Sequence, residues 1–278
     1  SEQGKTLSAR SVLLKYAAAG FTTIHEMGAT TESWDGLVDL ADQDRLPIRV
    51  FAWISAAGDH FDTLGAAGPI TSRAADMLTL RGLFITPDFK DCAPAYSAKL
   101  RNKIARANMR GFQAGVLVQG CVPPKSVYDA FNDVLAYASF DGRHRVIYAD
   151  TSSALAAPLS IDANVRAAVH VPAKTSPIDV PDELSVMAAT QAKSAPWLFW
   201  QMARAYGDNR AKALSALTQA PMEASFMEDR LGALEPGKWA DFIILDRDVM
   251  TMQQRAIADV QVLETWVAGE KVELSSLQ

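Results

Sequence analysis

Strand-like and helix-like segments alternate along most of this chain, and that alternation constrains its fold more than any other feature. Segments rich in apolar and β-branched residues lie at 21–27, 48–54, 81–86, 112–118 and 145–149. The segments between them, at 7–19, 33–44, 98–110 and 125–138, have the apolar spacing of helices. Such alternation is typical of a parallel sheet covered by helices. A (β/α) barrel and an open doubly wound sheet both fit it.

The pattern continues less regularly and then changes. Weaker strand signals lie near Leu159 and at residues 165–171, and helices are expected at 181–192, 197–205 and 209–219. Beyond Gly232 only short strands are predicted, at 241–245, 260–267 and 270–274, with a hairpin turn at Ala268 and Gly269. The last part of the chain is therefore expected to form a small β-rich unit.

Composition argues against several classes of function. The 278 residues carry a formal net charge of −5 and no long basic run, so nucleic acid is not an expected partner. Apolar runs are shorter than the roughly 18 residues that span a bilayer, and no GxGxxG or Walker loop indicates nucleotide binding. The two cysteines form no CxxC pair, which favours a reducing compartment, and we expect a cytoplasmic protein. The start SEQGK lacks Met and a signal-peptide profile, and we interpret it as processed, truncated or internal.

Several segments carry a family resemblance. Residues 232–246 (GALEPGKWADFIILD) resemble the C-terminal signature of the amidohydrolase superfamily. Residues 18–28 (AAGFTTIHEMG), 45–50 and 220–232 resemble its amidohydrolase-3, or YtcJ-like, branch. The resemblance implies an α/β fold with a TIM-like (β/α) barrel that lacks its first strand here, plus a small C-terminal β-sandwich segment. It divides the chain into a barrel portion at 1–230 and a sandwich portion at 231–278.

The resemblance also implies a metal-dependent chemistry. Members of this family bind one or two divalent metal ions, such as zinc, which activate a water molecule and polarise the scissile bond. Their ligands are a His-x-His on the first strand, a Lys on the fourth and one His each on the fifth and sixth. An Asp after the last strand serves as general base.

These ligands are replaced at each position that can be aligned. Residues 81–88 align with the family's fourth strand, which carries the Lys. Residues 111–121 align with the fifth strand and residues 144–150 with the sixth, each of which carries a His. The replacements are Phe84 for Lys, Leu117 for His, Cys121 for Asp, Ile147 for Glu, Tyr148 for His and His170 for the catalytic Asp. Phe and Leu cannot bind a metal, and Tyr replaces imidazole poorly. We therefore assign no metal ligand in this chain, although the family expectation of zinc stands.

Four residues are the candidate catalytic groups. His170 lies at a strand end, where the alternative is a surface or interface histidine. Asp88 and Asp150 follow strands and could face a barrel mouth, or be solvated loop carboxylates. Cys121 could be a nucleophile or a plain small residue, since no His is near it in sequence.

Three further polar residues belong to the predicted barrel strands. His25, on the first of them, is either an acid–base group or a hydrogen-bonded barrel residue. Glu26 and Tyr148 are candidate polar groups of a remodelled pocket.

Three functions remain open at this stage. The first is a hydrolase component that acts on C–N bonds of an amide or cyclic amide in a small molecule, without activity expected of this chain alone. The second is a metal-free pseudoenzyme or partner subunit that completes a homologous or N-terminal chain. The third is a lyase or isomerase in a remodelled barrel. Because a barrel short of one strand exposes an edge, we expect a second polypeptide or a homo-oligomer.

Overall fold

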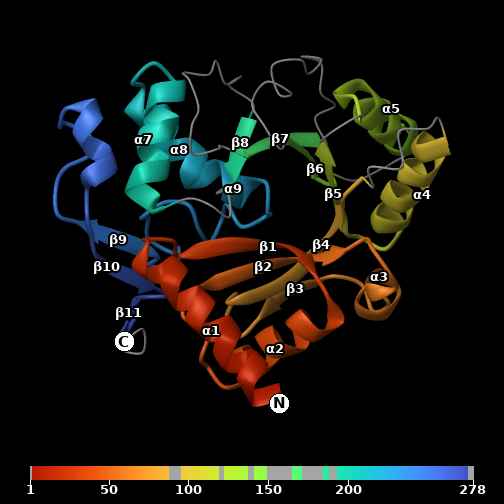
Figure 1. Ribbon diagram of the computed structural model, residues 1–278, viewed down its shortest axis with the longest axis horizontal. Coiled ribbons are helices and arrows are strands. Elements are labelled where there is room, and N and C mark those ends of the chain that lie inside the picture. Colours follow the sequence, from red (N-terminus) through yellow and green to blue (C-terminus); the bar gives the residue numbers. More distant parts are fainter. Residues whose placement is uncertain are drawn as a thin grey trace.

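A curled parallel sheet with helices on its outer side forms most of the molecule (Figure 1). The structure, a computed structural model, describes residues 2–87, 95–118, 122–136, 141–148, 165–170, 184–187 and 193–274. Asp88, Cys121 and Asp150 lie outside these residues, as does the strand expected near Leu159.

Seven strands run parallel in the order β1-β2-β4-β5-β6-β7-β8. They are β1 (Thr23–Ala29), β2 (Arg49–Ser55), β4 (Leu78–Ile85), β5 (Gln113–Val118), β6 (His144–Tyr148), β7 (Val165–His170) and β8 (Leu184–Met187). A further strand, β3 (Ile70–Arg73), pairs antiparallel with β4. Among the described strands, β1 and β8 each have one neighbour, so the sheet curls without closing. Eight strands normally close such a barrel, and the predicted incomplete TIM-like barrel is confirmed.

Helices follow the strands as the alternation predicted. They are α1 (Glu2–Ala18), α2 (Thr31–Asp42), α3 (His60–Leu64), α4 (Ala95–Met109), α5 (Pro124–Leu135), α7 (Ala195–Ala205), α8 (Arg210–Leu217), α9 (Gln219–Glu223) and the 3₁₀ helix η1 (Gln254–Asp259). Helix α2 begins with a capping box, in which Thr30 and Ser33 each accept a hydrogen bond from the other's backbone N–H.

The two faces of the sheet have different partners. On β2, Val50, Ala52 and Ile54 belong to the main core, which includes residues of α1, α2, α4 and α5. The alternate residues Phe51 and Trp53 point inward, and Phe51 packs with Met222, Met227 and Leu231. This alternation follows from the two-residue period of a strand. Both faces are buried, which explains why the strands read as nearly continuous apolar runs.

Trp53 fills the middle of the barrel because two glycines face it. A Cβ atom built on Gly82 would lie 2.1 Å from the Trp53 ring, and one on Gly115 would lie 2.8 Å from it. These residues belong to the neighbouring strands β4 and β5. The indole therefore separates a lower layer at the amino ends of the strands from an upper layer at their carboxyl ends.

The C-terminal part is a three-stranded antiparallel sheet of β9 (Phe242–Leu245), β10 (Val262–Val267) and β11 (Glu270–Lys271). The hairpin predicted at Ala268 and Gly269 joins β10 to β11. Asp241 accepts two hydrogen bonds from the buried Arg49 side chain, at 2.7 and 2.8 Å, and so ties this sheet to the barrel. The predicted domain boundary after residue 230 stays a prediction.

The helix predicted at residues 181–192 was wrong at residues 184–187, the part of that range that the structure describes. Leu184–Met187 is the strand β8, which pairs parallel with β7. Short apolar runs do not distinguish a strand from a helix by their period alone, and here the pairing with β7 decides. Within the described ranges, no helix is both long and apolar enough to cross a bilayer. A cytoplasmic location stays a prediction.

Candidate functional site

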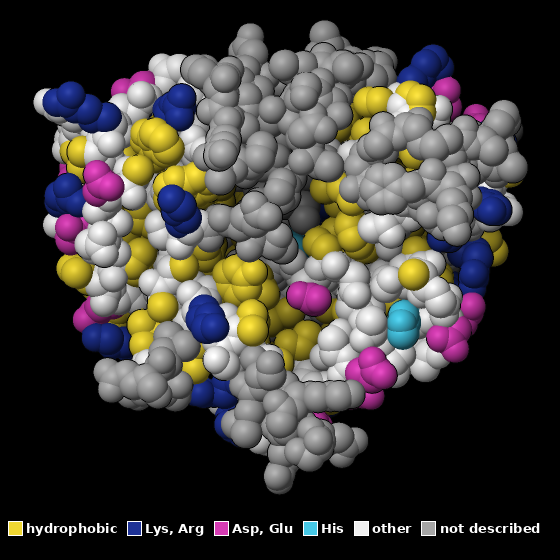
Figure 2. All heavy atoms as spheres, viewed as in Figure 1, with side chains coloured by type: hydrophobic (Ala, Val, Ile, Leu, Met, Phe, Trp, Pro, Cys, Tyr) yellow, Lys and Arg dark blue, Asp and Glu magenta, His cyan; other side chains and the backbone are white. Residues whose placement is uncertain are grey.

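A large cavity occupies the open side of the curled sheet. Its volume is about 1680 Å³. Figure 2 shows a hollow in this face of the molecule with hydrophobic side chains around it. The inner faces of four strands contribute His25, Met27, Phe84, Leu117 and Ile147 to its wall. Of these, Met27, Phe84, Leu117 and Ile147 form the upper layer of the barrel, where active sites of (β/α) barrels are found.

Three positions aligned with the family's polar site residues face this cavity, but they carry apolar side chains. Phe84, Leu117 and Ile147 come from the neighbouring strands β4, β5 and β6. No group of three or more His, Cys, Asp or Glu residues able to hold a metal occurs in the part of the chain that the structure describes. Because hydrocarbon side chains offer no lone pair, Phe84, Leu117 and Ile147 do not fit a divalent metal ion.

Tyr148 was aligned with a metal-binding histidine, but it does not face the cavity. Its side chain is fully buried, and its hydroxyl lies 2.5 Å from the hydroxyl of Tyr128 on α5. Burial raises the pKa of Tyr148, so the phenol stays protonated. Neighbouring residues of a strand point to opposite faces, and Ile147 takes the inward position. The expectation that Tyr148 is a polar group of the pocket is therefore wrong.

His25 is a neutral histidine held by an arginine. Its Nδ1 lies 3.3 Å from Nη1 of Arg145, and its ring meets Phe51 edge-on at 5.4 Å. Because a guanidinium only donates, Nδ1 accepts, and the ring hydrogen is on Nε2. Burial, and then the charge of Arg145, lower the pKa of His25 well below its usual range. The geometry agrees with the hydrogen-bonded barrel residue rather than with a proton carrier.

Glu26 is the acidic residue of β1 at the cavity wall. It pairs in register with Ala52, whose side chain belongs to the outer core, so Glu26 is on the helix side of β1. Burial raises the pKa of its carboxyl group. A carboxyl group with a raised pKa can donate as well as accept a proton nearer neutral pH.

The lower end of the barrel is closed by polar groups that the sequence reading did not single out. Arg145, fully buried, donates to the Ala224 carbonyl and to Ser225 Oγ, both at 2.9 Å. Its guanidinium lies 4.6 Å from the Trp53 ring centroid. Burial lowers the pKa of Arg145 to about 9. The signal was present, since the apolar strand predicted at 145–149 begins with an arginine, Arg145.

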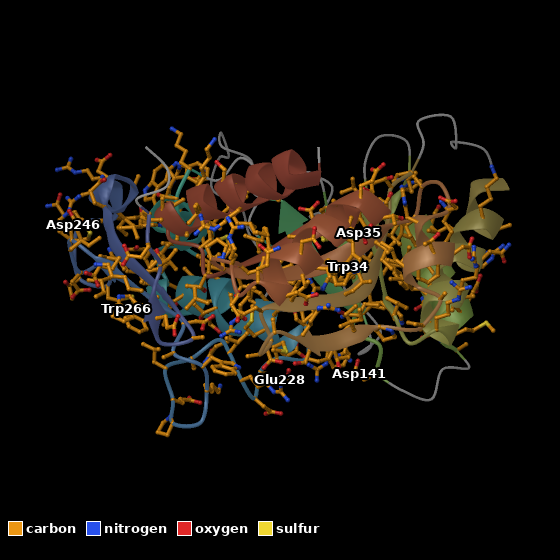
Figure 3. The ribbon with its side chains drawn as sticks, turned by 90° about the horizontal axis from the view of Figure 1, so that it is seen from below. Trp34, Asp35, Asp141, Glu228, Asp246 and Trp266 are labelled. Carbon is orange, nitrogen blue, oxygen red and sulfur yellow. The ribbon has the colours of Figure 1, made fainter. Side chains whose placement is uncertain are left out.

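Phe226 completes this floor from below. Its ring lies between the guanidinium groups of Arg81, at 3.9 Å, and Arg143, at 4.2 Å. Arg143 in turn pairs with Glu228 at 2.7 Å and Asp141 at 3.1 Å. Figure 3 shows Asp141 and Glu228 on the same side of the molecule. These contacts gather charged and aromatic side chains at the amino ends of the strands.

The structure places one of the four candidate catalytic residues. His170 is the last residue of β7 and pairs in register with Met187 of β8. It therefore lies at the carboxyl end of the sheet, as predicted from the sequence. Asp88, Asp150 and Cys121 lie outside the described residues, so the catalytic roles of all four stay predictions.

A segment in the C-terminal part of the chain matches a known family. The family model described as "Amidohydrolase family" matches residues 202–272. This segment runs from α7 through β9–β11. A comparison with curated proteins finds no match.

Solved structures of hydrolases share the fold. An uncharacterized metal-dependent hydrolase from Pyrococcus horikoshii OT3 is 16% identical with a TM-score of 0.64, over 92% of this chain and 62% of its own. A putative prolidase from Bifidobacterium longum is 14% identical with a TM-score of 0.60, over 97% and 77%. A triazine hydrolase variant is 15% identical with a TM-score of 0.57, over 96% and 71%.

The family match confirms the resemblance to the amidohydrolase-3 branch over residues 202–272. The solved structures share the fold of the chain. Hydrolases are the kind of protein with which the chain shares its fold and its C-terminal family segment. The chain spans only 62% of the length of the Pyrococcus hydrolase.

Proposed function

We propose that this protein is a component of an amidohydrolase-type hydrolase that cleaves C–N bonds in amides or cyclic amides. The observation that carries the proposal is the cavity at the carboxyl ends of the strands, with Phe84, Leu117 and Ile147 in the inward positions where the family has its polar groups. In this proposal the chain supplies the substrate-binding wall. The metal-binding groups belong to another polypeptide.

The wall suits the apolar part of a substrate. Burying apolar surface there would contribute about 25 cal/mol per Å² removed from water. The cavity, about 1680 Å³, is larger than the ~300–1,000 Å³ typical of small-molecule pockets. It therefore has room for a substrate and for protein groups from a partner. Two solved structures of similar fold, a triazine hydrolase variant and a putative prolidase, support a hydrolase.

The apolar replacements also favour a second candidate function, a metal-free partner subunit or pseudoenzyme. In that case the cavity binds a small molecule without converting it, and the only role of the chain is structural, as a subunit of the assembly. This alternative differs from the first in one property, which is hydrolysis by the complete assembly.

The test isolates the native assembly through a tag on this chain. Intact mass spectrometry gives its polypeptides, elemental mass spectrometry gives its metal content, and a panel of N-acyl amines and cyclic amides gives its activity. We expect a second polypeptide, near-stoichiometric metal in the assembly and hydrolysis of at least one substrate. The isolated chain should show neither metal nor hydrolysis. An assembly without hydrolysis would favour the pseudoenzyme, and tightly bound metal in the isolated chain would contradict our assignment of ligands.

A further inference from the structure

We propose that the base of the cavity is a subsite for an uncharged hydrocarbon group of the substrate, an aryl or branched alkyl substituent, and that it excludes carboxylate, ammonium and hydroxyl groups. The base consists of Met27, Phe84, Leu117 and Ile147. That the ligand is a substrate rests on the proposed function, whereas its binding can be measured without hydrolysis.

The four side chains of the base form one continuous layer. Leu117 and Ile147 are partners in register on β5 and β6, so they lie side by side on the inner face. Phe84 reaches from β4 toward the end of β1, since a Cβ atom built on Gly28 would lie 3.7 Å from its ring. Gly28 follows Met27 directly. Hydrocarbon and thioether groups of these strands therefore cover the base.

A solid layer lies directly beneath the base. Trp53 is 2% exposed, and its ring is held against Gly82 and Gly115. A Cβ atom on Gly115 would lie 2.8 Å from the Trp53 ring and 3.3 Å from Cδ1 of Ile147, so both side chains pack over the same glycine. A ligand group therefore stops at this layer, and the base has its shape without a ligand.

Polar groups near the base are turned away from it. The Tyr148 hydroxyl is hydrogen-bonded behind the sheet to a tyrosine of α5. The His25 ring lies in the lower layer, where its Nδ1 accepts from Arg145. Ser55, at the carboxyl end of β2, accepts the Ala57 N–H with its hydroxyl. A polar ligand group at the base would lose its water without gaining a partner from these residues, which opposes its binding.

The base also has apolar surface that a ligand can bury. Phe84 and Leu117 are partly exposed, whereas Leu83 and Val116, beside them on the same strands, are 1% and 0% exposed. Leu83 and Val116 belong to the core on the outer side of the sheet, and Phe84 and Leu117 border the cavity. A hydrocarbon group placed on this inner surface removes it from water, which favours binding.

The rim of the cavity, in contrast, carries polar side chains. Thr30, Glu32 and Ser33 follow β1 at its carboxyl end and line the same cavity. A substrate with its hydrocarbon group at the base would direct its amide group toward this rim. The bond to be cleaved would then lie at the mouth of the barrel, where the proposed function requires groups of a partner to reach it.

The test uses the full chain and three amides that differ in one substituent, para-toluamide, para-hydroxybenzamide and para-carboxybenzamide. NMR follows binding through the methyl groups of Leu117, Ile147 and Val12, the last of which lies on α1 in another part of the cavity wall. Para-toluamide should shift the Leu117 and Ile147 signals and leave Val12 unchanged. We expect the hydroxyl compound to bind roughly tenfold more weakly and the carboxylate on the order of a hundredfold more weakly, because the base gives neither group a partner.

A pair of variants locates the subsite within the cavity. Leu117→Asn makes the base polar at nearly the same volume and should weaken para-toluamide binding roughly tenfold. Val12→Asn is the matched control, because Val12 lines the same cavity but is 47% exposed. It should change the binding by less than about twofold. If Leu117→Asn fails to fold, intermolecular NOEs between the para-toluamide methyl group and the Ile147 methyl groups make the same test on the unmodified chain.

Several results would overturn the proposal. They are no binding of para-toluamide, equal binding of the three amides, NOEs to Val12 alone, or a loss in Val12→Asn as large as that in Leu117→Asn. Selective binding of para-toluamide without hydrolysis by the complete assembly would count against the proposed function and leave the subsite standing. Hydrolysis of amides that carry no hydrocarbon group, without binding of para-toluamide, would support the proposed function and contradict the subsite.

Discussion

The two ends of the barrel differ in where they place polar groups. At the amino ends of the strands, Arg145, Arg143 and Arg81 are held by carbonyl groups, carboxylates and the Phe226 ring. At the carboxyl ends, where chemistry is expected, Phe84, Leu117 and Ile147 form an apolar wall. Polar groups at the lower end of such a barrel serve stability rather than catalysis. In the described part of the barrel, charged side chains therefore support the fold at one end, and apolar side chains face the cavity at the other.

The largest effect is expected where the lower end meets the C-terminal sheet. Asp241→Ala leaves Arg49, which is fully buried, without its carboxylate partner. Breaking a buried ion pair from one side typically costs about 3–5 kcal/mol. Chemical denaturation should show a loss of that size. Asp42→Ala, which removes the partner of Arg73 at the surface, is the matched control and should cost less than about 1 kcal/mol. Equal losses would mean that the buried pair does not hold the sheet to the barrel.

A second test concerns the pH dependence of the lower end. Burial lowers the pKa of His144 to about 4, and its Nδ1 accepts the Ala114 N–H at 2.9 Å. An unfolded His has a pKa of about 6.5, so the unfolded chain binds the proton more readily, and stability falls as pH drops from about 6.5 to about 4. The loss should be on the order of 2–3 kcal/mol.

The measurement is the free energy of unfolding between pH 7.5 and pH 4, all conditions being reached by buffer exchange. His144→Gln removes the titrating ring, and the slope over this window should become shallower. His60→Gln is the control, because this histidine is on the surface helix α3 and bonds only the Thr31 segment. A slope that His60→Gln reduces as much as His144→Gln would contradict the assignment to the lower end.

The middle layer should be less tolerant than the helix layer to a single methyl group. Gly82→Ala places a Cβ atom 2.1 Å from the Trp53 ring, and overpacking of this kind costs about 1–3 kcal/mol. Gly36→Ala, in helix α2 with nothing within 4 Å of the added atom, should instead stabilise by roughly 0.5–1 kcal/mol. The measurement is the thermal unfolding midpoint of each variant relative to the unmodified chain. A neutral Gly82→Ala would show that Trp53 can move and does not divide the barrel.

The smallest effect is expected in the upper layer. Leu117 is only partly buried because it borders the cavity. Leu117→Ala should therefore cost about 1 kcal/mol, less than the ~2–5 kcal/mol of a packed core leucine. Leu80→Ala, on the outer face of β4 with 1% exposure, is the matched core variant. If both cost the same, the upper layer is packed and the space above Trp53 is smaller than described.

Most strands and helices could be predicted from the sequence. Strands of a parallel sheet are buried on both faces, so their sequences are long apolar runs that stand out from the helices between them. The runs at 48–54 and 112–118 correspond closely to β2 and β5. The strand β8 was misread because four residues carry too little periodicity to exclude a helix. Local signals cannot show the pairing with β7, because residues 171–183 separate the two strands.

The site was only partly predictable. Alignment identified the inward positions Phe84 and Leu117, and the structure places both at the cavity. It failed at Tyr148, where a shift of one residue exchanges the two faces of a strand. The role of Arg145 depends on Ser225 and Ala224, which are far away along the chain, so its surroundings could not be read from the sequence.

The position of β1 in the cavity wall has a kinetic consequence. A polypeptide that covered β1 would cover part of the cavity wall as well, because residues 23–27 line the cavity. Assembly and residence time would then be linked: a ligand bound before that polypeptide arrives would dissociate more slowly afterwards, without any new contact to it.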